Sequence, residues 1–365
     1  MDAIELRHKI HMNPETAYKE YETTNLLEQT LGKFSEIIVH KPFDTGLIGE
    51  YKVNEGDYLL FRADIDALAI EEKTGWEFAS KNSKMHACGH DVHTSILYGL
   101  IEKVCEKKPD KNLLFFFQPA EEGGGGAKVT IDTGFFENYS IQHAFALHVN
   151  DEYDFGTIAF NNDVLFASAM ELFVDFQGKP THVATPEKGK NAFNALRMFL
   201  DAAEKIPITQ SNPLLLVVGK AIAGSAPNIV PENAKIEGSI RSLDMNQSQR
   251  FFEQLQVVGK GVSLATGVEV DVKKRAFYPE VRNDPKLFER LYYELGKKFK
   301  TIKTNYAMTG EDFGFFTRKY PSVMFWLGTQ KDEKHGLHSP YFLPSDDLIP
   351  MGSEMLYSIL ELFLA

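Results

Sequence analysis

Few folds can accommodate residues 113–117 (LLFFF), an unbroken apolar run. A strand in which every side chain is apolar is buried on both faces, as in a parallel sheet covered by helices on both sides. The run leads directly into the acidic pair Glu121 and Glu122. Adjacent glutamates usually form a solvated pair, but after a core strand they indicate a site at the edge of a sheet.

Two more apolar runs end in residues that could bind a metal or carry a proton. Residues 58–61 lead into Asp64 and Asp66, and residues 143–149 carry His148 near their end. Because the carboxyl ends of parallel strands meet at one edge, these side chains are expected close together. The alternatives are a solvated turn for the aspartates and a core histidine with satisfied hydrogen bonds for His148.

Residues 85–95 hold three histidines, a cysteine and an aspartate, in a chain with 11 histidines and 2 cysteines among 365 residues. Cys88 and His90 can reach one cation together, since Gly89 lets the backbone between them bend tightly. The alternative is that Cys88 packs as a small apolar group and the histidines make local hydrogen bonds. The concentration of ligand types favours a metal site.

The order of the expected elements predicts two domains. Strands and helices alternate up to residue 166, as in an α/β domain with a mostly parallel sheet. A βαββαβ pattern follows, which predicts a ferredoxin-like layer. Its strands and helices are expected near residues 171–176, 189–205, 214–220, 233–243, 246–265 and 268–274. We therefore predict one domain from residues 1–166 and 277–365, with residues 167–276 inserted into it.

Charge and cysteine content narrow the class of protein. A net charge of −12 argues against binding to nucleic acid or an anionic membrane. No apolar run approaches the about 20 residues that span a bilayer, and the polar N-terminus does not read as a secretion signal. Two cysteines without an expected disulfide indicate a reducing compartment, so we predict a cytoplasmic protein.

Five scattered donors would form a metal centre if they converge. One thiolate, three imidazoles and one carboxylate suit one or two divalent cations such as zinc, cobalt, nickel or manganese. A thiolate shared by two ions would explain why the donors outnumber the four of a tetrahedral zinc site. The predicted ligands are Cys88, His90, Glu122, His148 and His338.

Such a centre would hydrolyse an unactivated amide, because a metal-bound water has a lowered pKa. The water also needs a base that is not itself a ligand, and Glu121 can take that proton beside the ligand Glu122. Asp64 or Asp66 can hold a ligating imidazole by its second nitrogen.

Four segments resemble the metallo-amidohydrolases of the aminoacylase and carboxypeptidase superfamily. They are residues 62–68 (RADIDAL), 85–91 (MHACGHD), 118–123 (QPAEEG) and 308–313 (MTGEDF). The likeness runs in order from about residue 5 to residue 350, and is closest to the branch of hippurate hydrolases and indole-acetyl-amino-acid hydrolases. It implies a zinc-peptidase-like α/β catalytic domain with an inserted ferredoxin-like lid or dimerisation domain, and hence a homodimer.

Further motifs, in residues 308–314, 319–321, 324–328 and 335–338, are similar to deacetylases of this branch. They imply removal of acetate from N-acetyl-LL-2,6-diaminopimelate in lysine biosynthesis. The resemblance also implies Asp64 as an active-site acid and Glu121 as the proton acceptor, and its ligand pattern agrees with the five donors above.

In the inserted domain, family members carry a Gly-Gly-His-Ala-Ala segment followed later by Pro-His, where this chain has residues 178–187 (GKPTHVATPE). His182 is retained and would help to hold the oxyanion, often from a partner subunit. The second glycine and the later histidine are replaced. These replacements concern the fit of the substrate and not the metal chemistry. Asn228 and Arg241 are candidates to bind the substrate carboxylate, against turn-forming and surface-charge roles.

Three other functions remain open. A broader aminoacylase or hippurate-type hydrolase, which acts on other N-acyl amino acids, needs the same metal chemistry, and so does a carboxypeptidase. A metal-binding or ligand-binding module without activity is the third, although such a protein is expected to have lost Glu121 or a ligand.

Overall fold

The computed structural model describes residues 1–208, 213–331 and 333–364. The chain divides into two compact units. The first unit comprises Met1–Leu165, Val281–Tyr306 and Asp312–Ala365, and the second comprises Phe166–Glu280 and Ala307–Glu311. Each unit has its own hydrophobic core.

The first unit is built on a mixed sheet whose centre is parallel. Its strand order is β1 (Ile38–His40), β2 (Leu47–Tyr51), β4 (Asn112–Gln118), β3 (Tyr58–Asp64), β5 (Ile141–Asp154), β14 (Ser322–Gln330), β6 (Ile158–Phe160) and β13 (Thr301–Lys303). The four strands β4, β3, β5 and β14 run parallel, as predicted for the apolar runs. Outside them, β2 and β6 are antiparallel to their inner neighbours. A separate pair joins β7 (Val164–Phe166) to β12 (Val281–Arg282).

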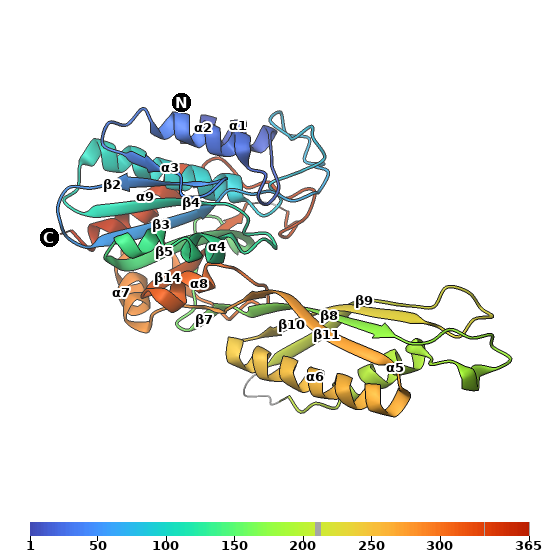
Figure 1. The fold of residues 1–365 in the computed structure, drawn as a ribbon. Helices are drawn as coiled ribbons and strands as arrows, with labels where there is room; N and C mark the ends of the chain where they lie inside the picture. Colours follow the sequence, from blue (N-terminus) through green and yellow to red (C-terminus); the bar gives the residue numbers. More distant parts are fainter. Residues whose placement is uncertain (209–212, 332, 365) are drawn as a thin grey trace. The chain divides into compact units, whose positions relative to one another are not determined.

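Helices cover both faces of this sheet, as the unbroken apolar strands require (Figure 1). The larger layer packs into one core with the sheet and comprises α1 (Ala3–Met12), α2 (Tyr21–Leu31), α3 (His90–Lys107), α7 (Pro285–Leu295) and α9 (Leu348–Glu361). The opposite face carries α4 (Gly126–Asp132), the 3-10 helix Phe135–Asn138 and α8 (Gly314–Lys319). There the ring of Phe116 lies 5.5 Å from Phe136 and 5.7 Å from Phe316.

The second unit has the predicted ferredoxin-like order. Four antiparallel strands are arranged β11 (Glu269–Tyr278), β8 (Ser168–Gln177), β10 (Asn233–Ser242) and β9 (Leu214–Ala223). Helices α5 (Ala192–Ala203) and α6 (Met245–Thr266) cover one face, and a 3-10 turn spans Pro186–Lys188 (Figure 1). The prediction of an α/β protein with an inserted sheet layer is therefore confirmed. Among the described residues, no helix is long and apolar enough to cross a membrane.

Candidate metal centre

The ends of two central strands, the middle of a third and the start of one helix meet at one side of the first unit's sheet. Strand β3 ends at Asp64, β4 ends just before Glu121, and β5 carries His148. Helix α3 begins at His90, directly after Gly89. Gly89 has φ +82°, and a Cβ there would lie 2.4 Å from the Val149 side chain, so only glycine permits this entry to the helix.

A buried thiol and two buried imidazoles converge here. The candidate ligand atoms of Cys88, His90 and His148 all lie within 4.8 Å of one another, and Cys88 Sγ is 3.4 Å from His148 Nε2. His148 Nδ1–H donates to the Val149 carbonyl at 2.8 Å, which leaves Nε2 as the ring nitrogen beside the thiol. His90 Nδ1–H donates to the Asp66 carbonyl at 2.9 Å. Both rings therefore direct Nε2 toward the cluster.

Glu122 and His338 extend the cluster. His338 Nε2 lies 3.1 Å from Glu122 Oε1, and the candidate ligand atoms of Cys88, Glu122 and His338 lie within 4.8 Å of one another. The same holds for His90, Glu121 and Glu122. Cys88 thus belongs to two overlapping groups, which is the arrangement needed for a thiolate that serves two cations.

The charge around these donors fits a divalent cation. Burial lowers the pKa of His90, but Asp64, Asp66 and Glu122 outweigh burial and raise it to about 10. Burial, Glu122 and Glu121 raise the pKa of the Cys88 thiol. His90 Nε2 is buried, has no hydrogen-bond partner in the part of the chain that the structure describes, and lies 3.7 Å from Asp64 Oδ2. An orphaned imidazole nitrogen among surplus carboxylates is what a metal ion compensates, so the residues present fit such an ion.

Asp64 is held by two residues that the sequence analysis did not select. Its Oδ1 accepts from His93 Nδ1–H at 2.7 Å, and its Oδ2 accepts from Arg62 Nη1 at 2.9 Å. His93 Nε2 accepts the Val149 N–H at 2.9 Å, so both ring nitrogens are already engaged. Burial raises the pKa of Asp64, but His90 and Arg62 outweigh burial and hold it well below the usual range. Asp64 therefore stays ionised beside His90.

Asp66, the second aspartate of the predicted pair, contacts both His90 and Glu122. Its carbonyl and its Oδ1 face His90 Nδ1, at 2.9 and 3.2 Å. Its Oδ2 accepts the Glu122 N–H at 2.9 Å. Of the two aspartates weighed for holding an imidazole, Asp66 makes that contact with His90, and Asp64 makes it with His93.

His338 reaches the cluster on a loop, whereas His90 begins α3 and His148 lies within β5. It has φ +64°, its side chain is 51% exposed, and its N–H donates to the Ala87 carbonyl at 2.9 Å. Asp151 of β5 fixes the loop, since its Oδ2 accepts the backbone N–H groups of His335 and Gly336, each at 2.8 Å.

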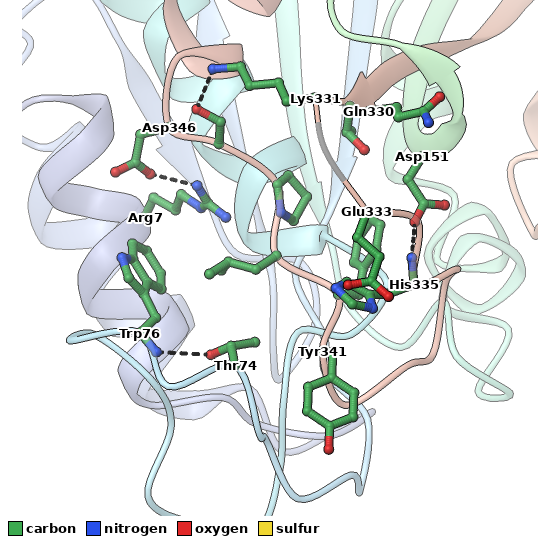
Figure 2. Close-up of a pocket in the computed structure, with 15 residues that line it drawn as sticks. Arg7, Thr74, Trp76, Asp151, Gln330, Lys331, Glu333, His335, Tyr341 and Asp346 are labelled. Carbon is green, nitrogen blue, oxygen red and sulfur yellow. Dashed lines mark hydrogen bonds and ion pairs between the residues drawn. The ribbon is translucent and has the colours of Figure 1, made fainter.

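The same loop forms one wall of a cavity of about 560 Å³ (Figure 2). Arg7 and Trp76 line another part, and Arg7 Nη1 pairs with Asp346 at 2.6 Å. None of the five predicted ligands lines this cavity. The cavity is therefore not the site of the five predicted ligands.

The remaining predicted residues belong to the second unit. His182 and Asn228 are exposed and lie on adjacent segments, since the Val183 N–H donates to the Asn228 carbonyl at 3.2 Å. His182 Nδ1 accepts the Ala184 N–H at 3.1 Å. Arg241 is half-buried on β10.

Comparisons with known proteins agree with this fold. Residues 60–362 match the family model of Peptidase family M20/M25/M40. A putative aminohydrolase from methicillin-resistant Staphylococcus aureus superposes with a TM-score of 0.92 at 25% identity, over 100% of this chain and 96% of that one. The Bacillus subtilis YXEP protein, described as a dinuclear metal binding peptidase from the M20 family, superposes with a TM-score of 0.83 at 26% identity, over 99% and 97%.

Curated relatives match over nearly the whole chain. N-acetyldiaminopimelate deacetylase from Shouchella clausii is 34% identical over 99% of this chain and 98% of that protein. The enzyme of the same name from Lactococcus lactis is 36% identical over the same shares. A family match across most of the chain, together with these full-length relatives, leads to one conclusion: this chain is a member of Peptidase family M20/M25/M40.

Proposed function

We propose that the protein is a metal-dependent amidohydrolase that converts N-acetyl-LL-2,6-diaminopimelate to LL-2,6-diaminopimelate and acetate, a step of lysine biosynthesis. The observation that carries the chemistry is the convergence of Cys88, His90 and His148 within 4.8 Å, beside Glu121 and Glu122. The substrate is carried over from the full-length relatives named N-acetyldiaminopimelate deacetylase.

Cys88, His90, His148, Glu122 and His338 would hold one or two divalent cations, with the Cys88 thiolate shared between them. Zinc, cobalt, nickel and manganese all suit this mixture of sulfur, nitrogen and oxygen donors. The dinuclear description of the Bacillus subtilis protein supports two ions. When bound, the metal would supply a polarised acetyl carbonyl and a water of lowered pKa.

Glu121 would move the proton. It is 7% exposed, and its carboxylate lies within 4.8 Å of the candidate ligand atoms of His90 and Glu122. It would take a proton from the attacking water and return it to the departing amine. Asp64, fixed by His93 and Arg62, would keep a negative charge beside His90.

The second unit would complete substrate binding. His182 would stabilise the negative charge that develops on the carbonyl oxygen. Asn228 and Arg241 would bind a carboxylate of the substrate. We also place a homodimer contact in this unit, because its edge strand β9 exposes Leu215 and Val217, which are 43% and 56% exposed. The pathway and the free thiols Cys88 and Cys105 favour a cytoplasmic enzyme.

The substrate assignment is tested by acetate release from purified protein that has been chelated and then reloaded with zinc, cobalt, nickel or manganese in turn. Turnover of N-acetyl-LL-2,6-diaminopimelate should exceed that of benzoyl-glycine and of a simple dipeptide. Faster benzoyl-glycine hydrolysis would replace the assignment with a broader N-acyl-amino-acid hydrolase, and faster dipeptide hydrolysis with a carboxypeptidase. If the reloaded protein hydrolysed none of these three compounds, the remaining function would be a metal-binding or ligand-binding module without activity.

The proton-transfer role is tested by Glu121→Gln. This variant should keep its metal content and lose about 10³-fold or more in kcat, because removal of a general base typically costs two to four decades. Glu137→Gln, on the surface, is the matched control and should behave as wild type. Near-wild-type turnover of Glu121→Gln would transfer the role to another residue.

A further inference from the structure

The turn that carries Glu121 and Glu122 is tightly closed. Ala120 has φ +56°, a left-handed conformation that is unfavourable for a residue with a side chain. The Gly126 N–H donates back to the Ala120 carbonyl at 2.9 Å, and a Cβ on Gly126 would lie 1.8 Å from the Pro119 carbonyl oxygen. A turn of this kind persists only where its surroundings hold it.

Glu20 holds the beginning of this turn. Glu20 is 0% exposed, and its Oε1 accepts the Ala120 N–H at 2.9 Å. The Thr45 side chain also hydrogen-bonds to this carboxylate. Among the described residues, its buried Oε2 has no hydrogen-bond partner and no cation pairs with it. Burial and the neighbouring Asp66 raise the pKa of Glu20 to about 7. Such burial of an acid is costly, so the contact with Ala120 needs a reason beyond stability.

Tyr18 holds the end of the turn. Its hydroxyl donates to the Gly124 carbonyl at 2.6 Å. Its ring approaches so closely that a Cβ on Gly124 would lie 2.9 Å from Tyr18 Cε2. Tyr18 is itself left-handed, with φ +59°, and is 41% exposed, so burial in the core does not account for its placement.

The segment that supplies both side chains is itself tied to the candidate metal centre. The Ala67 N–H donates to the Glu15 carbonyl at 2.7 Å, and Thr16 pairs with Ala67 in an isolated bridge. Ala67 follows Asp66, whose side chain contacts both His90 and the Glu122 N–H. Residues 15–20 therefore contact both the strand end that orients His90 and the turn that carries the glutamates.

We propose that Tyr18 and Glu20 are positioning residues, which clamp the two ends of the Ala120–Gly124 turn and so fix Glu121 relative to the ligand Glu122. This inference rests on the proposed function, because the group it positions is the proposed proton acceptor. Neither side chain needs to touch the substrate. A misplacement of about 1 Å at a catalytic group is enough to cost two decades in rate.

The clamp is tested with Tyr18→Phe, Glu20→Ala and Glu20→Gln, and with Tyr21→Phe as the control, an exposed tyrosine three residues further on. Tyr18→Phe should lower kcat about tenfold and Glu20→Ala at least as much, with KM changed less than about threefold. Glu20→Gln should retain most of the activity, because its amide oxygen can still accept the Ala120 N–H. Tyr21→Phe should match wild type.

A second readout does not depend on activity. In the metal-free proteins, hydrogen exchange of a peptide covering residues 118–126 should be faster in Tyr18→Phe and Glu20→Ala than in wild type, Glu20→Gln or Tyr21→Phe. Variants with unchanged exchange and kcat within twofold of wild type would overturn the clamp. Inactivity of the wild-type protein would instead refute the proposed function, and exchange alone would then decide the clamp.

Discussion

A single buried arginine, Arg62, holds three polar groups beneath the candidate metal centre. Its Nη1 donates to Asp64 at 2.9 Å, its Nη2 to Asp312 at 3.0 Å and its Nε to Gln118 at 2.9 Å, and its side chain is 0% exposed. Arg62→Met should lower the free energy of unfolding by about 3–5 kcal/mol, because two carboxylates would stay buried without their cation. Urea unfolding of the metal-free proteins measures this change.

The control for Arg62→Met is Arg197→Met, which removes an exposed ion pair with Asp201 on α5. It should cost less than about 1 kcal/mol, because solvent screens such pairs. Equal effects from the two substitutions would mean that Asp64 and Asp312 find other partners or take up protons.

His11 gives a prediction for the pH dependence of stability. Its Nδ1 lies 2.9 Å from Asp91 Oδ2 and its Nε2 lies 3.1 Å from Glu72 Oε1. Burial lowers the pKa of His11, but Asp91 and Glu72 outweigh burial and raise it from 6.5 to about 9. Because the folded pKa is the higher one, this stabilisation is complete below pH 6.5 and is lost as the pH rises through 9.

The size of this effect follows from the shift in the pKa of His11. Each pKa unit corresponds to about 1.4 kcal/mol, so the stabilisation is a few kcal/mol at most. The unfolding free energy of the wild type should fall between pH 7 and pH 9.5, and that of His11→Gln should fall much less over the same range. Parallel curves for the two proteins would show that His11 is neutral in the folded state.

The long apolar strands were predictable from the sequence, and the short elements were not. The apolar runs that form β3, β4 and β5 are recognisable in the sequence. These strands bring Asp64, the Glu121–Glu122 pair and His148 to one edge of the sheet. Strands β6 and β13 have only three residues each, too few for a periodic pattern. The apolar pattern over residues 2–31 predicts one helix, interrupted at residues 13–15 by Pro14. In the structure this segment forms α1 and α2 with a longer break.

The residues around Asp64, which include Asp312 on the other side of Arg62, show why part of the site could not be predicted from the sequence. Arg62 and Asp312 are separated by 250 positions, so no local pattern connects them. His93 lies three residues after His90 on the same face of α3, which was a usable signal. That spacing, however, does not say which imidazole would bind an ion and which would bind an aspartate.

The edge strand β9 is expected to mediate self-association. It lies at the end of the second unit's sheet and exposes Leu215, Val217 and Ile222, of which Val217 is 56% exposed. An apolar edge of this kind pairs with another strand unless it is protected. Val217→Lys should therefore convert the proposed dimer to monomer in analytical ultracentrifugation.

The control for Val217→Lys is Val257→Lys, which places the same charge on α6 at a residue that is 67% exposed. It should leave the association state unchanged. A dimer that survives Val217→Lys at micromolar concentration would move the contact away from β9.

The whole molecule contains two cores in one chain, and only the first unit contains the proposed ligands. One core joins the central sheet to α1, α3 and α9, and the other joins the ferredoxin-like sheet to α5 and α6. A ligand that binds only the folded state stabilises the unit that binds it, by about 4 kcal/mol at 1,000 times its Kd. Calorimetry should therefore resolve two transitions, of which metal removal lowers one by roughly 10 °C.

The second unit serves as the internal control in this measurement, because His182, Asn228 and Arg241 are proposed to contact the substrate and not the metal. Its transition should keep its midpoint when a chelator is added. Zinc should restore the first transition, and the protein with Cys88→Ser should need a higher zinc concentration for the same recovery, because it lacks the proposed shared thiolate. A chelator that shifts both transitions equally would mean that the units unfold as one cooperative block, and one that shifts neither would remove the metal centre from the first unit.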